Sequence, residues 1–486
     1  MTKARLAACF ALLIPLATSA HAREPAPAGG LGGDPFGSGS ETDPFAALES
    51  APQPAEPGQA AQIEPGRSPD LTLHGYLESR DQIRTGANQA AISTRQRLWL
   101  EADGTLLPEG TAGNLGEVRF FASGALDIDP AAADLSDDHD TLRLHAEEVF
   151  VTLDSDDLDL VIGRKMLRWG MGDGINPLDL INPLDYRDPI ASGRADSRVP
   201  VVLGQAIFRL PAVGPLQEAT LEAVVIPLAQ VDELNAPGSA WEGYALKELR
   251  KADAQGQLIF ADQQKPDDLW NDAEFGVRLA VTTSGWDLAL IGFHGRLDSA
   301  VLARDLVLDS NGTAIPRLTP IHPTFSAFGI NVAKGLERST IRGELSLKPD
   351  LPMMLRDDKA TPGYDRRSVV EGVVGIDRTF GINLYTNLQY YFTSIPDAAD
   401  LAGESYDHGM TYEIHDLFLQ DDLEAGIRGV ASFANEGWTF EPYAEYRLGD
   451  DWLLGASLLL FEGPEDSRYG QFADNDMLNI RLRYSF

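Results

Sequence analysis

The sequence predicts an all-β protein, a transmembrane antiparallel β-barrel of about 18 strands (16–18) that follows a disordered N-terminal tail. Three observations predict this fold. Apolar and polar residues alternate with the period of two that β-strands show. Long and short connections alternate between the candidate strands, as they do in membrane barrels. Beyond the N-terminus, no segment has the roughly 18 continuous apolar residues that a membrane helix requires.

Residues 1–22 have the pattern of a secretory signal peptide. Lys3 and Arg5 precede an apolar run, and residues 20–22 form a small-x-small cleavage site, so the mature chain is expected to begin near Arg23. Cys9, the only cysteine, would leave with the signal peptide, which excludes disulfides and thiolate metal sites from the mature protein. The net charge of -35 argues against binding to nucleic acids.

Residues 23–69 are rich in Pro, Gly, Ala and Ser and contain few large apolar residues. Such a segment buries too little surface to offset the entropy lost on ordering, so we predict a disordered periplasmic tail. An Asp-Pro-Phe motif occurs twice in it and contributes Phe36 and Phe45. Two interpretations remain open: the motifs dock a periplasmic partner, or the tail is a plain linker with two incidental phenylalanines.

Residues 70–486 are predicted to form the barrel domain. In segment 338–348, for example, Ile341 and Leu345 lie on one face, and Arg342 and Glu344 lie on the other. In a membrane barrel the apolar face meets lipid and the charged face lines the lumen, whereas in a soluble sandwich the charged face would be outside. The candidate strands are 71–80, 92–103, 117–128, 141–153, 158–168, 200–210, 217–227, 272–283, 286–297, 323–335, 338–348, 366–378, 383–394, 410–420, 423–434, 438–448, 452–462 and 476–486.

The connections favour the membrane barrel over the sandwich. Every second connection is mostly short, and most of the others are long, which is typical of bacterial outer-membrane barrels with short periplasmic turns and long outer loops. Two connections, 104–116 and 435–437, fit this pattern less well and leave the strand count open by two. The longest outer loop, 228–271, has a capping box from Ser239 to Glu242 and a plausible stop at Gly256, which together predict a helix.

The last candidate strand, 476–486, has apolar residues at the even positions from Leu478 to Phe486 and polar or charged residues between them. This ending resembles the closing strand of Gram-negative outer-membrane β-barrels. The resemblance implies that Tyr484 and Phe486 form an assembly signal for the barrel assembly machinery.

The third outer connection, which begins near residue 169, contains Ile-Asn-Pro-Leu-Asp twice, six residues apart. Each Asn-Pro pair favours the start of a turn, so the loop is expected to be compact. The pattern Gly-Arg-x-x-x-Arg-Trp-Gly followed by two Asn-Pro-x-Asp units resembles one found in porin-like and alginate-export-like outer-membrane barrels of Gram-negative bacteria. The resemblance implies a pore or conduit, and in general porins the third outer loop folds into the barrel.

This loop is the predicted pore constriction. Its opposite charges could create a transverse field that favours polar solutes, or they could pair locally and hold the loop, and the two roles are compatible. The predicted constriction residues are Arg164, Arg168, Trp169, Asp173, Asn176, Asp179, Asn182, Asp185, Arg187 and Asp188.

The predicted function is an outer-membrane channel for small polar solutes that is narrowed by this loop. The alternatives are an export conduit for a polysaccharide or lipid, and a barrel scaffold that docks a periplasmic partner through its tail. None of the histidines lies in a recognisable nucleophile motif, so we predict no enzyme, and we expect neither a cofactor nor a metal. The expected partners are outer-membrane lipid, lipopolysaccharide and the assembly machinery, and the sequence does not indicate an oligomeric state.

Overall fold

The computed structural model describes residues 71–486 except for 87–89, 111–115, 132–140, 188–196, Pro215, 309–311, 357–359 and Asn435. The predicted signal peptide and the predicted tail with Phe36 and Phe45 lie outside the described residues.

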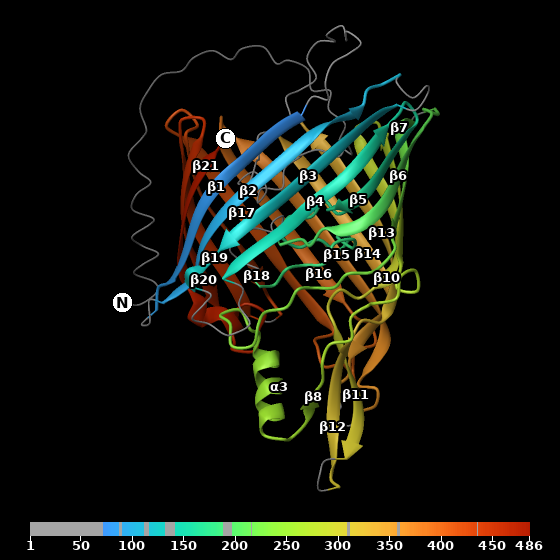
Figure 1. The fold of residues 1–486 in the computed structure, drawn as a ribbon, viewed down its shortest axis with the longest axis vertical. Coiled ribbons are helices and arrows are strands. Elements are labelled where there is room, and N and C mark those ends of the chain that lie inside the picture. Colours follow the sequence, from blue (N-terminus) through green and yellow to red (C-terminus); the bar gives the residue numbers. More distant parts are fainter. Residues whose placement is uncertain are drawn as a thin grey trace. The chain divides into compact units, whose positions relative to one another are not determined.

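Eighteen strands form one closed antiparallel sheet, as the sequence predicts (Figure 1). Each strand pairs with the preceding and following barrel strands, and the last strand pairs with the first and closes the ring. A barrel of this size is wide enough to enclose an aqueous channel. Its strands are β1 Leu71–Arg84, β2 Ala91–Leu107, β3 Glu117–Ile128, β4 Leu142–Asp154, β5 Leu158–Lys165, β6 Val201–Leu210, β7 Leu216–Ile226, β9 Glu274–Thr283, β10 Trp286–Arg296, β13 Thr324–Leu336, β14 Ser339–Met354, β15 Tyr364–Phe380, β16 Leu384–Ser394, β17 Tyr406–Phe418, β18 Leu423–Ser432, β19 Gly437–Leu448, β20 Trp452–Glu462 and β21 Met477–Ser485.

The two faces of the strands differ as the alternation predicts. In β9, Phe275 and Val277 are 52% and 49% exposed, whereas Glu274, the residue before Phe275, is 2% exposed. The same arrangement in β14 exposes Ile341 and Leu345 and buries Glu344. Because large apolar side chains cover the outside of the ring and charged groups are enclosed, the barrel is of the transmembrane kind.

Short turns lie at one end of the barrel and long connections at the other. The turns 284–285, 337–338 and 449–451 belong to the short-turn end, and the connections 166–200 and 227–273 belong to the long-loop end. Trp286 and Trp452 begin strands at the short-turn rim, and Trp438 is the second residue of β19 at the opposite rim; all three are exposed. Exposed tryptophans at both rims suit the interfaces between lipid and water.

Two long connections carry structure of their own, which projects beyond the same end of the barrel (Figure 1). A three-stranded sheet consists of β8 (Ile259–Phe260), β11 (Val301–Leu308) and β12 (Ala314–Ile321), in which β11 and β12 form an antiparallel hairpin and β8 joins β12 in parallel. The helix α3 spans Tyr244–Ala254. None of the helices in the described part of the chain is long and apolar enough to cross a membrane.

The predicted capping box does not start this helix. The N-cap is Gly243, which provides no side-chain hydrogen bond, and Ser239 instead accepts a backbone hydrogen bond of 3.3 Å from Glu242 within a turn. Trp241 explains the shift, because its ring packs into an apolar cluster and holds this segment out of the helix. The predicted stop is correct, since Gly256 follows the helix with a positive φ of 69°.

Phe486 lies at the seam where the last strand, β21, pairs with the first strand, β1. Its backbone N–H donates to the carbonyl of Gly75 at 2.9 Å, and the N–H of Gly75 donates to the carbonyl of Phe486 at 3.0 Å. A Cβ at Gly75 would lie 2.8 Å from Cζ of Phe486, so the glycine leaves room for the terminal ring. Tyr484 stacks between Phe486 and Trp452, with ring centroids 6.2 and 4.8 Å away.

Deleting Phe486 is expected to lower the amount of barrel in the membrane several-fold, because the deletion removes two seam hydrogen bonds and the ring over Gly75. The amount of protein in the outer-membrane fraction and its heat-modifiable gel mobility measure this. Phe380→Ala, which changes an exposed aromatic residue near another turn of the same rim, is the matched control. Equal amounts of the deletion variant and the wild type would contradict an assembly role.

Candidate pore and constriction loop

The connection between β5 and β6, which we call the inner loop, is described at residues 166–187 and 197–200. These residues lie inside the barrel and contact strands beyond β5 and β6. Its residues hydrogen-bond to side chains of β7, β13, β14, β16 and β17. The most distant contact joins the hydroxyl of Thr411 in β17 to the carbonyl of Asp173 at 3.3 Å. The loop therefore crosses the lumen from one side to the other.

Trp169 anchors the start of this crossing. Its side chain is 1% exposed and lies in an apolar cluster with Leu178 and Phe293. The indole Nε1–H donates to Oε1 of Glu222 at 2.9 Å, and the backbone carbonyl accepts from Nδ2 of Asn331 at 2.7 Å. The indole N–H therefore has a hydrogen-bond acceptor and the rings have apolar neighbours, as a buried indole requires.

Two glycines of the wall make room for the loop. Gly276 in β9 faces the indole of Trp169, and Gly329 in β13 faces the side chain of Leu178. A Cβ at either position would collide with the facing side chain. An isolated glycine within a strand often marks such a close approach.

Glu344 and Gln389 hold the middle of the loop. The Glu344 carboxylate accepts hydrogen bonds from the backbone N–H groups of Met171 and Gly172, the second at 2.6 Å. Gln389 accepts from the N–H of Asp173 at 2.8 Å and donates to the carbonyl of the same residue at 2.7 Å. Because both side chains bind backbone groups, they fix the course of the loop.

The first Asn-Pro-Leu-Asp unit forms a hydrogen-bonded turn, as the sequence predicts, whereas the second forms a bend that continues into isolated β-bridges. In the first, the N–H of Asp179 donates to the carbonyl of Asn176 at 3.3 Å across the turn. In the second, Asn182 accepts from the N–H of Leu167 at 2.7 Å and donates to the carbonyl of Val199 at 2.9 Å. The second unit therefore ties the beginning of the loop to its end.

The charges of the loop pair with near neighbours. Arg198 donates to Asp179 at 3.0 Å, and Arg187 donates to Asp185 at 2.6 Å and also contacts Glu233. Burial raises the pKa of the Asp185 carboxyl, but hydrogen bonds from Arg187 outweigh it and hold this pKa below its usual value. The Asp185 tie is therefore formed at neutral pH and weakens only as the pH falls below the usual carboxyl range.

Three further predicted residues bind near neighbours or the far wall. Arg164 donates to the carbonyl of Glu147 at 2.9 Å, and Arg168 donates to the carbonyl of Gly172 at 2.5 Å. Asp173 accepts from Asn387 at 2.6 Å. Asp188 lies outside the described residues.

A cavity of about 720 Å³ lies between the inner loop and the opposite wall, at the long-loop end of the lumen. Of the predicted constriction residues, Asn176, Asp179 and Asp185 line it. Wall charges such as Arg428 also line it, and so does a group of aromatic residues that was not predicted from the sequence. The aromatic lining residues are Tyr186, Trp241, Tyr391, Phe392, Tyr469 and Phe472.

The wall of the lumen carries opposite charges in pairs. These pairs neutralise one another and leave a wall of mixed sign rather than a belt of one charge. Examples are Arg97 with Asp127 at 2.8 Å, Arg483 with Glu78 at 2.7 Å, Arg428 with Glu441 at 2.8 Å, and Arg481 with Glu445 at 2.6 Å.

A family model described as "Protein of unknown function (DUF1302)" matches residues 109–486. No curated protein matches the sequence. Among solved structures, the Salmonella typhi porin OmpF in complex with daunomycin has a TM-score of 0.40 at 10% identity, covering 86% of this chain and 97% of that one. A mutant porin of Rh. blastica has a TM-score of 0.39 at 12% identity, covering 86% of this chain and 100% of that one. The strand pairing, and not these likenesses, defines the barrel.

Proposed function

This chain belongs to the family described as "Protein of unknown function (DUF1302)", and we propose that it is an outer-membrane channel for small polar solutes. In this proposal the inner loop narrows the lumen, and solutes pass between the loop and the wall of β14–β20. The observation that carries the proposal is the path of the loop, which crosses an eighteen-stranded barrel and is bonded to the far wall. A barrel of this width leaves an aqueous interior unless something fills it.

The charge pattern supports polar solutes of either sign. Many lumen charges of the described residues occur as Arg–carboxylate pairs, such as Arg428 with Glu441, so the described wall carries both signs of charge side by side. Dedicated anion pores would carry a ring of Arg or Lys. We therefore expect weak selectivity between anions and cations.

Planar-bilayer recording of the purified full chain tests the proposal. Wild-type protein is expected to conduct in discrete steps, with a reversal potential near zero in a KCl gradient because positive and negative lumen charges are paired. Folding is verified beforehand by heat-modifiable gel mobility. A correctly folded barrel that inserts but never conducts would contradict a channel.

The aromatic lining of the cavity favours a second candidate, a conduit for a polysaccharide. Tyr391, Tyr469 and Trp241 give the long-loop cavity flat apolar surfaces beside charged groups such as Arg468. Sites with a largely apolar, aromatic lining and a few polar groups are typical of ligand binding. A conduit predicts that oligosaccharides block the current from the long-loop side and that Tyr469→Ala relieves the block. A simple porin predicts no such block.

A further inference from the structure

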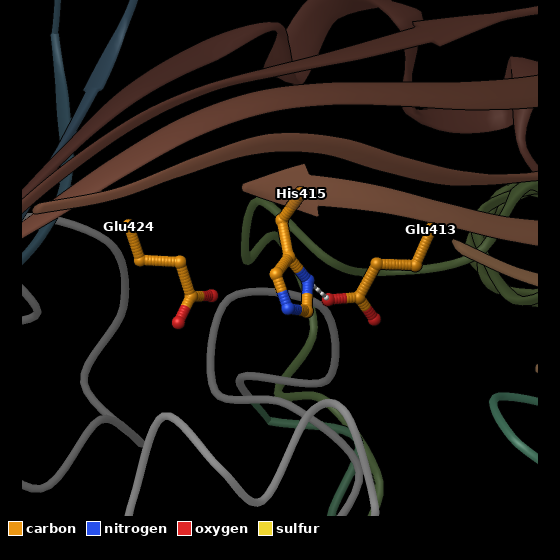
Figure 2. Close-up of side chains that lie close together, drawn as sticks. All are labelled: Glu413, His415 and Glu424. Carbon is orange, nitrogen blue, oxygen red and sulfur yellow. Dashed lines mark hydrogen bonds and ion pairs between the residues drawn. The ribbon is translucent and has the colours of Figure 1, made fainter. Parts of the chain in front are cut away.

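A second cluster of functional side chains lies in the lumen on the other side of the inner loop. Glu413 and His415 come from β17, and Glu424 comes from β18 (Figure 2). Glu413 and His415 are two residues apart, so a strand places both on its inner face. Thr411, the preceding residue on that face, already touches the inner loop, so the cluster lies between the loop and the turn 419–422 at the short-turn end.

We propose that Glu413, His415 and Glu424 bind a divalent transition-metal ion, with Zn²⁺ as the best match. Each residue offers one ligand atom, and these atoms lie within 4.8 Å of one another. Imidazole nitrogen and carboxylate oxygen are Zn²⁺ ligands at about 2.0–2.2 Å, which places ligand atoms roughly 3.5 Å apart. Side-chain adjustments of about 1 Å would therefore close the site around an ion.

The carboxylates of this cluster lack the partners that other lumen carboxylates have. Among the residues that the structure describes, no Lys or Arg forms an ion pair with Glu413 or Glu424, whereas Glu441 and Glu445 are each paired with an arginine. Glu413 is 2% exposed, and its Oε2 has no hydrogen-bond partner in the described chain. Two close carboxylates, one of them almost fully buried, are costly without a cation.

The groups around the cluster orient it in the way that a metal site requires. Nδ1 of His415 lies 3.0 Å from Oε1 of Glu413, and no described residue hydrogen-bonds to Nε2. The hydroxyl of Tyr443 lies 3.0 Å from a carboxylate oxygen of Glu413 and 3.0 Å from one of Glu424, which it can serve alternately as donor. Such outer hydrogen bonds fix the orientation of metal ligands and tune their affinity.

The neighbouring strands β16 and β18 both approach His415. The ring of Tyr385 in β16 stacks on the ring of His415, with centroids 4.8 Å apart and planes 23° apart. On the other side, Gly426 in β18 faces His415, and a Cβ there would lie 2.6 Å from the histidine Cβ. The absence of a side chain at Gly426 therefore leaves room for the Cβ of His415 against β18. His415 is thus held at the position where the two carboxylates converge.

The test is zinc binding to the full chain, purified in detergent without a polyhistidine tag and freed of metal with a chelator. Isothermal titration with ZnCl2 is expected to show one saturable site, and His415→Gln and Glu424→Gln are each expected to weaken it by about tenfold or more. Co²⁺ provides a second readout, since a visible absorption band should appear with wild type and be lost in His415→Gln.

The matched control is His145→Gln. His145 also lies between two lumen carboxylates, but Asp127 and Glu147 lie 3.3 and 2.7 Å from its two ring nitrogens, and Arg97 already pairs with Asp127. This variant is expected to bind zinc like the wild type. Heat-modifiable gel mobility verifies that each variant is folded. Glu424→Gln is used rather than Glu413→Gln because Glu413 is more deeply buried, so that its substitution is more apt to disturb folding.

Two results would overturn the proposal: no saturable zinc binding by folded wild type, or binding that persists unchanged in folded His415→Gln. Because titration does not require ion conduction, its outcome is independent of the proposed channel. A conducting barrel that binds no zinc would leave the channel standing and remove the metal site. A silent barrel that binds zinc would do the reverse.

Discussion

Deleting residues 172–190 is expected to raise the single-channel conductance severalfold. The deletion removes the part of the inner loop that crosses the lumen, together with its bonds to Gln389 and Thr411 on the far wall. Current through a pore is limited by its narrowest section, so clearing this section should have a larger effect than any point mutation in the wall. Single-channel steps in planar bilayers measure the change.

The control is a deletion in another long connection, outside the lumen. Removing residues 306–314 shortens the projecting β11–β12 hairpin, whose Leu306 and Leu308 are exposed. That variant should retain wild-type steps. If the folded inner-loop deletion conducts no better than the hairpin deletion, the inner loop does not set the width of the path.

Trp169→Ala is expected to loosen the inner loop while the barrel stays closed. The substitution removes a buried indole from its apolar cluster and takes the Nε1–H donor away from Glu222. Replacing a buried Trp by Ala typically costs about 3–5 kcal/mol. If this cost falls on the attachment of the loop, its open state becomes about two to three and a half orders of magnitude more populated, since every 1.4 kcal/mol is about tenfold.

Hydrogen exchange followed by mass spectrometry measures this directly. The reporting amides are those of Gly172 and Asp173, which bond to Glu344 and Gln389 in the wild type. The control is Trp270→Ala, which removes an exposed tryptophan from another long connection. Exchange at Gly172 and Asp173 should accelerate in the first variant and stay the same in the second. Equal exchange in both would show that other contacts hold the loop without Trp169.

The strands were predictable because the membrane imposes a simple rule on each of them. Every strand must present apolar residues outward, and the closed ring satisfies its backbone hydrogen bonds with neighbours in the sequence. The pairing of β9 with β10 or β20 with β21 therefore follows from local patterns. The predicted start of the helix was wrong because Trp241 is buried in an apolar cluster, which keeps residues 239–242 out of the helix that the local motif specifies.

The wall residues that bind the inner loop could not be predicted in the same way. Its partner Glu344 lies 172 positions along the chain from Gly172, and Gln389 lies 216 positions from Asp173. Lumen side chains such as Glu344 were predicted to face inward, but nothing local distinguishes one that binds a loop from one that meets water. Gly276 and Gly329 are the signal that was available, because a glycine within a strand points to a close approach.

The seam between β1 and β21 has a kinetic consequence. The buried contact between Arg483 and Glu78 joins residues 405 positions apart, whereas most other strand pairs meet across a single connection. By loop-closure entropy this separation costs only about 3 kcal/mol more than a short hairpin, so the seam is not thermodynamically weak. Its high contact order matters for the order of events, because β1 has no partner on one side until the final strand arrives. During folding, β1 is therefore an open sheet edge, and an open edge is prone to pair with another chain.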